Sequence, residues 1–364
     1  MVVRWIAALA AFAIVILIGV VTLGNFGTGI DTGNFSDTEG ANSFALIGAI
    51  ALVIAFIVYA AVEYAQTGGF ASIASQFDTR TIVLMPIAVA INIILGATVA
   101  NALKLPIYLD SIGTILVGAL AGPVAGALTG FLTNTLWTYV IPPPFQNGPA
   151  AAFGIVAVVI GVIAGLAGRA GWMRPRPNRT TSELAVGGLI ALAIVIGLAL
   201  YAYTRFYGTG FEFFNPDNDS MLFVILGWLV GLIVAAFVVG FLVLLFVRRD
   251  LAVAYVTVLG VVTGLIAALI SAPISANVFG GVTGGGTDFL VAAFRQAGAD
   301  LQTATFQQGL LSDPVDKLVT FFVVYLILAA MARRTKARFP QGERLIEEGE
   351  AEPVEEGEWR GATA

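Results

Sequence analysis

The chain has 364 residues, of which 58% are apolar and only 11% are charged, and its mean hydropathy is +0.92. Soluble proteins carry about 25% charged residues, so this composition excludes an ordinary soluble domain and predicts that most of the chain lies in lipid. The sequence contains no His and no Cys. Imidazole catalysis, His or Cys metal sites and disulfides are therefore excluded, and no cofactor or metal site is predicted.

Ten apolar segments are candidates for membrane-spanning helices, which need about 20 residues each. In chain order they are Trp5–Leu23, Phe44–Ala65, Thr81–Leu103, Leu109–Ala121, Val124–Ile141, Ala150–Gly168, Leu184–Phe206, Met221–Val247, Leu251–Ile270 and Leu318–Met331. The first segment is longer than a typical signal-peptide core and no A-x-A pattern follows it, so we expect a retained helix.

The positions of Lys and Arg predict the orientation of these helices, because short cytoplasmic loops gather positive charge. With ten crossings, one side receives Arg4, Arg80, Arg169, Arg174, Arg176, Arg179, Arg248, Arg249, Arg333, Arg334, Lys336 and Arg338. The prediction is an all-α, polytopic bundle of about ten spans in the cell membrane, with both termini in the cytoplasm.

Two parts of this pattern are irregular. Leu109–Ala121 is too short to cross a hydrocarbon core of about 30 Å, so it must be shielded by protein, and Gly122–Pro123 predicts a tight turn after it. Ser271–Pro314 is a Gly-rich stretch that we expect to form an external cap or a re-entrant segment. Asp313–Pro314 is typical of a helix start.

The polar segments predict linkers rather than soluble domains. Residues 171–183 read as a basic cytoplasmic linker with prolines, and beyond Phe339 the acidic composition predicts a disordered tail. The sequence contains no Walker A motif, so active transport would draw energy from an ion gradient or from a partner. No nucleic-acid partner is expected.

Compact residues recur every four positions on the third predicted span: Ala88, Asn92, Gly96 and Ala100. This spacing places them on one helix face. The face is either a packing seam inside the protein or a docking surface for another membrane protein, and Asn92 adds a polar group that needs a partner if it is buried.

Candidate binding residues gather at the outer ends of the predicted spans. Asp110 is either a functional acid or a capping residue at the start of a short helix. Asn134 and Trp137 lie about one helical turn apart on the next span, although Trp137 and Tyr139 also fit an interfacial aromatic belt.

The Gly-rich stretch has five glycines within Gly280–Gly286, which permit close backbone approach to a ligand. Asn277, Thr283, Asp288 and Arg295 could add directional contacts. The alternative is a flexible loop in which Asp288 caps the following helix. Lys317 and Asp313 have the i,i+4 spacing of an ion pair, which the spacing does not distinguish from ligand binding.

Three segments together are similar to one known family: LPIYLDSIGTILVGALAGPVAGALTGFLTN, APISANVFGGVTGGGTDFL and SDPVDKLVTFFVVYLIL. They resemble the substrate-binding S component of energy-coupling factor (ECF) vitamin transporters. The likeness covers about residues 81–178 and 251–335. It divides the chain into two extra N-terminal helices (1–80), a first core part (81–178), an inserted helix pair with the basic linker (179–250), a second core part with the Gly-rich loop (251–338) and the acidic tail (339–364).

The resemblance implies a six-helix core that captures a vitamin or other small nutrient from outside and docks on a transmembrane scaffold (T) subunit carrying two ABC-type ATPases. It implies no enzymatic activity of the chain itself. It places the pocket near Asp110, Asn134, Trp137, Asn277, Thr283, Asp288 and Arg295, and favours scaffold docking through Ala88, Gly96 and Ala100, where Asn92 interrupts the stripe. The alternatives are a stand-alone secondary transporter, a sensor with a separate cytoplasmic effector and, more distantly, an enzyme acting on lipid.

Overall fold

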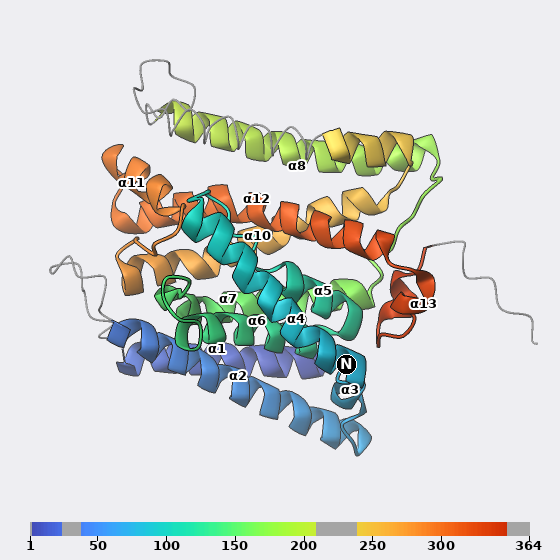
Figure 1. The fold of residues 1–364 in the computed structure, drawn as a ribbon, viewed down its shortest axis with the longest axis horizontal. Coiled ribbons are helices and arrows are strands. Elements are labelled where there is room, and N and C mark those ends of the chain that lie inside the picture. Colours follow the sequence, from blue (N-terminus) through green and yellow to red (C-terminus); the bar gives the residue numbers. More distant parts are fainter. Residues whose placement is uncertain (1, 24–37, 209–238, 348–364) are drawn as a thin grey trace, which may run out of the picture.

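The computed structural model describes residues 2–23, 38–208 and 239–347. The described residues form helices and no strands, which confirms the predicted all-α class. Long helices lie side by side, with α11 (Asp288–Gln296) near one end of the molecule and α13 (Arg333–Lys336) near the other (Figure 1).

Six helices form the central bundle. They are α4 (Thr79–Gly96, continued by a π-helical segment, Ala97–Ala102), α5 (Ile112–Ala121), α6 (Pro123–Tyr139), α7 (Gly154–Arg169, preceded by a 3-10 turn, Gly148–Phe153), α10 (Ala252–Phe279) and α12 (Leu301–Ala330). α1 (Val2–Leu23), α2 (Thr38–Thr67), the short α3 (Ala71–Ala74) and α8 (Thr181–Gly208) lie around this bundle.

Five helices within the described residues are long and apolar enough to cross a membrane. They are Val3–Thr22, Asn42–Thr67, Thr79–Ala102, Gly148–Arg169 and Ala252–Phe279. The architecture is that of a helix bundle whose long apolar helices are compatible with a membrane. The count of ten spans and the cytoplasmic termini stay predictions, and most of the predicted span Met221–Val247 lies outside the described residues.

The short helix α5 lies in the interior of the bundle. All ten of its residues, Ile112–Ala121, are buried. The protein therefore shields this helix, as its length predicts, because a helix too short to span lipid cannot expose its ends there. Gly122 makes the turn into α6 with a φ of 132°, a conformation that favours glycine.

The helices around α5 approach one another closely because small residues line their contacts. A Cβ atom added at Gly161 of α7 would collide with the backbone of Gly126 on α6. Between α10 and α12, Gly264 lies against Pro314 in the same way. These contacts fix the spacing of the helices that surround the site described below.

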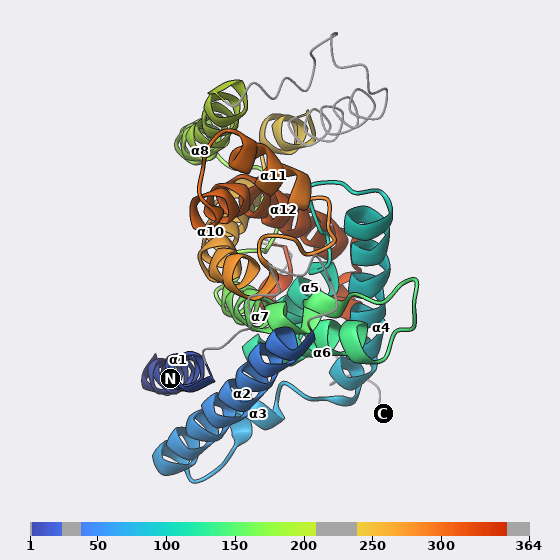
Figure 2. The same cartoon turned by 90° about the vertical axis from the view of Figure 1, so that its left-hand side faces the viewer.

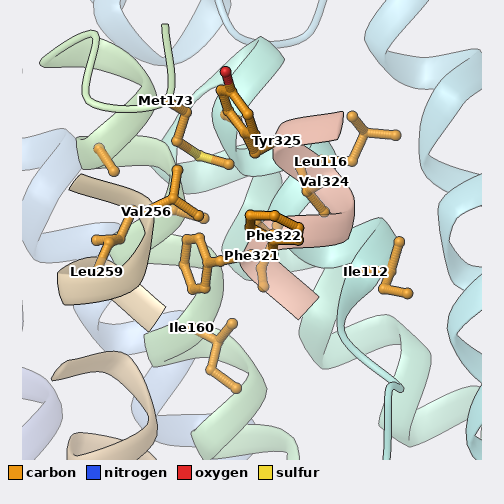
Figure 3. Packing of buried hydrophobic residues seen from close by; sticks show 14 of the residues in the cluster. Ile112, Leu116, Ile160, Met173, Val256, Leu259, Phe321, Phe322, Val324 and Tyr325 are labelled. Atoms are coloured by element: carbon orange, nitrogen blue, oxygen red, sulfur yellow. The ribbon is translucent and has the colours of Figure 1, made fainter. Parts of the chain in front are cut away.

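Large side chains fill the space between α5, α7, α10 and α12 (Figure 3). Phe321 and Tyr325 of α12 are almost fully buried, and they pack with Val256 of α10 and Ile160 of α7 in the same cluster. Met173 in the predicted basic linker is fully buried in this cluster. The linker is therefore packed on the bundle, with the guanidinium carbon of Arg176 4.4 Å from the centroid of the Tyr255 ring.

Two helical elements flank the bundle on different sides (Figure 2). α1 packs on α2 through the rings of Trp5 and Tyr59, whose centroids are 4.8 Å apart, and through an Arg4–Glu63 ion pair of 3.2 Å. α8 contacts the start of α10. The structure thus places α1, α2 and α8 outside the six-helix bundle.

Several of the basic residues that are predicted to face the cytoplasm contact one another's backbone at one end of the helices. Arg80 bonds to the carbonyl of Arg338, and Arg249 bonds to the carbonyl of Arg179. The segment directly after Phe339, predicted to begin a disordered tail, packs at this same end. The backbone amide of Gln341 donates to the carbonyl of Leu120 at 2.8 Å, and Leu345 is fully buried. Residues 348–364 lie outside the described part of the chain.

The Gly-rich stretch Ser271–Pro314 is more helical than predicted. α10 runs past Pro273 to Phe279, and α12 begins at Leu301, so Pro314 lies inside a helix and does not start one. The actual N-cap of α12 is Asp300, whose carboxylate accepts a hydrogen bond from the Thr303 amide at 2.9 Å. A proline within a helix leaves one carbonyl unpaired, which neighbouring helices tolerate in a bundle.

Candidate functional site

A cavity of about 100 Å³ lies at the end of the bundle opposite the basic residues. Its walls come from α6, α7, α10 and α12, and two loops cover it: residues 103–111 between α4 and α5, and the Gly-rich loop 280–287 between α10 and α11. Asp313 lies 18 residues before Met331, the C-cap of α12, which corresponds to a helical rise of about 27 Å. If the basic end marks one boundary of a hydrocarbon core of about 30 Å, the cavity lies near the other boundary.

A cluster of four charged residues forms the floor of the cavity on the α12 side. The Lys317 ammonium donates to Asp316 at 2.6 Å and to the Ser111 hydroxyl at 2.8 Å, and it lies 3.7 Å from Asp110. Asp316 in turn accepts hydrogen bonds from the backbone amides of Tyr108 and Leu109. Lys317 and Asp316 therefore join α12 to the loop that precedes α5.

Asp313, one turn before Lys317, is the fourth member of this cluster. It is 8% exposed and lines the cavity. Its carboxylate accepts hydrogen bonds from the hydroxyls of Ser271 at 3.0 Å and Ser312 at 3.3 Å. Within the described residues no cation lies within ion-pair distance of Asp313, so this buried carboxylate is balanced only by hydroxyl donors.

Three neutral polar side chains of the lining keep unused hydrogen-bonding atoms. Ser275 is 6% exposed and its hydroxyl makes no hydrogen bond with the described residues. The carboxamide nitrogens of Asn134 and Gln308 donate to the carbonyl of Gly130 and the hydroxyl of Ser312, but their oxygens accept nothing from the described part of the chain. Buried polar atoms are normally paired, so these three atoms are available to a ligand or to water.

Part of the cavity wall is apolar. It is formed by Trp137 of α6, Phe153 before α7, and Val156 and Ile160 on α7. Trp137 is 1% exposed and its indole nitrogen donates to the carbonyl of Phe145 at 2.8 Å. Trp137 is thus an interior residue, whereas Tyr139 is largely exposed.

The Gly-rich loop is held over the cavity by contacts with the 103–111 loop. The Lys104 ammonium donates to the carbonyl of Gly284 at 2.6 Å, and the hydroxyls of Tyr108 and Thr287 lie 2.6 Å apart. A Cβ atom at Gly286 would collide with the backbone of Lys104, so glycine is required for this approach. Burial raises the pKa of the Tyr108 phenol, which therefore stays neutral and able to donate.

The side chain of Asp288 holds the Gly-rich loop in its conformation. Its carboxylate accepts hydrogen bonds from the Thr283 amide, the Thr283 hydroxyl and the Gly284 amide, at 2.7–3.1 Å. Burial raises its pKa, while the donors of Thr283 and Gly284 oppose that rise. Asp288 therefore shapes the loop before it and does not line the cavity.

The structure brings together part of the predicted binding set. Asp110, Asn134, Trp137 and Thr283 all line the cavity. Asn277 and Arg295 are exposed and lie outside its lining, with Asn277 bonded to Gln302 and Arg295 to the carbonyl of Ala299.

Sequence reasoning missed several residues of the lining. Tyr108, Ser271, Ser275 and Gln308 were not among the predicted binding residues, and Asp313 and Lys317 were considered only as a pair. The helical spacing of Ser271 and Ser275, and of Gln308, Ser312 and Asp313, was a usable signal. The prediction that Ser271–Pro314 is an irregular external segment conceals this helical spacing.

The four compact residues of α4 face the interior of the bundle. Ala88, Asn92 and Ala100 are fully buried, and Gly96 is buried against Trp137 and Asp110. The Asn92 carboxamide donates to the hydroxyls of Thr114 and Thr133. In this structure the stripe is a packing seam within the chain, so these residues are not accessible to a partner.

Comparisons of the chain with protein-family models, with curated proteins and with solved structures find no match. The assignment of a function therefore rests on the geometry of the cavity.

Proposed function

We propose that this chain is the solute-capture subunit of an ECF-type importer, which binds a small nutrient from outside and depends on a scaffold and two ABC-type ATPases for release. The observation that carries the proposal is the cavity itself. It is lined by buried polar side chains that keep unpaired atoms, and it is covered by a loop that hydrogen bonds hold in place. Its position opposite the basic end fits entry from outside, because basic residues mark the cytoplasmic side.

The sequence adds a second line of support. The chain carries no nucleotide-binding motif, so an active importer built on it needs a partner to supply energy. The likeness to ECF S components covers about residues 81–178 and 251–335, which include the helices and loops that line the cavity.

The predicted docking stripe does not contribute to this proposal. Because Ala88, Asn92, Gly96 and Ala100 are buried, a scaffold would have to contact a different surface. The opposite face of α4 exposes Ile82, Val83, Ile87 and Ile94, which suit either lipid or a partner helix.

A stand-alone secondary transporter is the second candidate, favoured by the buried charges Asp313, Asp316 and Lys317 inside α12. Coupling-ion sites in such transporters lie near the bilayer midplane. The rise along α12 from Met331 is about 27 Å to Asp313 and about 21 Å to Lys317, both beyond the midplane of a hydrocarbon core of about 30 Å, which supports the capture subunit.

The experiment is affinity purification of the tagged full chain from its native membranes under mild solubilisation. We expect stoichiometric recovery of a polytopic scaffold and two ABC-type ATPases, with ATP hydrolysis by the complex and none by the isolated chain. Ion-gradient-driven flux through liposomes containing the chain alone would overturn the proposal in favour of a secondary transporter. Stoichiometric recovery of a signalling enzyme would overturn it in favour of a sensor.

A further inference from the structure

The charges around the cavity do not balance. Asp110, Asp313 and Asp316 surround a single Lys317, so the cluster has two more acids than bases. In the loops that cover the cavity, Lys104 and Asp288 lie near each other and their opposite charges compensate. The described residues around the cavity therefore include two more acids than bases. Burial favours the protonated form of such acids, and a bound cation would hold them ionised.

Lys317 is already engaged within the cluster. Its ammonium contacts Asp316 at 2.6 Å, Ser111 at 2.8 Å and Asp110 at 3.7 Å. An anionic ligand would have to displace these partners and would face Asp110 and Asp313, so the site disfavours negative charge. A cationic ligand, in contrast, would supply the charge that Asp313 lacks.

The unpaired neutral groups point to a ligand independently of the charges. Ser275, Asn134 and Gln308 are each more than nine-tenths buried, line the cavity and keep an atom without a partner in the described structure. The oxygens of Asn134 and Gln308 can only accept hydrogen bonds. A ligand group with several N–H donors satisfies such acceptors together with the carboxylates.

The remaining wall indicates an organic ligand. Trp137, Phe153, Val156 and Ile160 add apolar side chains to the lining that also carries Asp110 and Asp313. Within the described residues no group of His, Cys, Asp or Glu has the arrangement of a metal site. A bare metal ion would leave the apolar wall without a contact.

We infer that the cavity binds an organic cation, a solute whose protonated amine lies against Asp313 and Asp110 and whose apolar body lies against Trp137 and Ile160. This inference rests on the proposed function only in taking the cavity as the solute site. It narrows the nutrient to the class of small amines.

The test uses the full chain in lipid nanodiscs and three matched probes: benzylammonium, the neutral benzyl alcohol and the anionic benzoate. Ligand-observed NMR, with empty nanodiscs as the blank, measures their affinities. We expect benzylammonium to bind about tenfold more tightly than either of the others. Equal affinities, no binding of benzylammonium above the blank, or a preference for benzoate would overturn the inference.

Two variants and a control test which residues cause the preference for the cation. Asp313→Asn should remove most of it, whereas Glu183→Gln, which removes an acid at the basic end, should leave it unchanged. Ser275→Ala breaks no hydrogen bond of the described residues, so it should fold normally and weaken benzylammonium binding by about threefold. Retention of the full preference in both Asp313→Asn and Ser275→Ala would overturn the inference.

Binding of an inorganic ion at the same site is tested separately. Replacing NaCl with KCl at the same ionic strength should not alter the stability of the unliganded protein, and stabilisation by Na⁺ that Asp313→Asn abolishes would assign the site to an inorganic ion and overturn the inference. If benzylammonium is not preferred but the scaffold and ATPases are recovered, only this inference is overturned. If the chain binds the cation but no ATPases are recovered with it, the proposed function is overturned and this inference is retained.

Discussion

The carboxamide oxygen of Asn92 accepts a hydrogen bond from the backbone amide of Gly113 at 2.7 Å, and this contact joins the middle of α4 to the start of α5. The same side chain donates to the hydroxyls of Thr114 at 2.9 Å and Thr133 at 3.1 Å. One buried side chain thus connects three helices of the bundle that holds the cavity.

Replacing Asn92 with Leu should destabilise the folded protein by about 1–3 kcal/mol. The substitution keeps the branching of the side chain but leaves the Gly113 amide and two hydroxyls without this partner in the interior. Thermal unfolding in detergent measures the change, with Thr98→Val on the exposed side of the same helix as the control. An unchanged melting temperature for Asn92→Leu would contradict the described network.

Replacing Gly96 with Leu should impair solute binding, because a side chain at this position meets the Trp137 ring and lies 3.0 Å from the Cβ of Asp110 at its first atom. Both neighbours line the cavity. The matched control is Gly197→Leu on α8, where no atom lies within 4 Å of the added Cβ. Benzylammonium titration measures the effect, and equal affinities of the two variants would show that Gly96 does not border the site.

Replacing Asp288 with Ala should loosen the Gly-rich loop over the cavity. The change removes the acceptor for the Thr283 amide and hydroxyl and for the Gly284 amide. Hydrogen–deuterium exchange should then be faster in residues 280–287, while the core helices keep their protection. Arg295→Ala, on the exposed side of α11, is the control, and similar loop exchange in wild type and Asp288→Ala would refute this role.

Replacing Gln341 with Ala should weaken the basic end of the bundle. The Gln341 side chain is buried and donates to the carbonyls of Gly118 at 3.1 Å and Gly165 at 3.2 Å. Losing these donors should cost about 1–3 kcal/mol of the unfolding free energy. Gln296→Ala, at an exposed position, provides the comparison. The prediction fails if limited proteolysis and thermal melting do not separate the two variants.

Much of the bundle follows from local patterns in the sequence. The short apolar run before Gly122–Pro123 predicts a shielded helix, and α5 is buried along its whole length. The i+4 spacing on α4 predicts a common face for Ala88, Asn92, Gly96 and Ala100. Spacing alone does not say whether that face meets the same chain or another, and the structure turns it inward.

The cavity depends on contacts that a local pattern cannot reveal. Asp316 binds the backbone of Tyr108 and Leu109 across more than 200 residues of sequence. The interpretation of Asp313–Pro314 as a helix start also conceals the N-terminal part of α12, because proline is normally excluded from helix interiors and is tolerated here beside Gly264. The identity of the floor residues therefore emerges only from the packed bundle.

Native mass spectrometry of the full chain, released from its own membranes, tests most directly whether the cavity captures a solute. We predict a bound small molecule on the wild-type protein and on Gly197→Leu, and its loss from Gly96→Leu and Asp313→Asn. A wild-type protein that retains lipid adducts but carries no small molecule, or one whose adduct survives both cavity substitutions, would contradict the account.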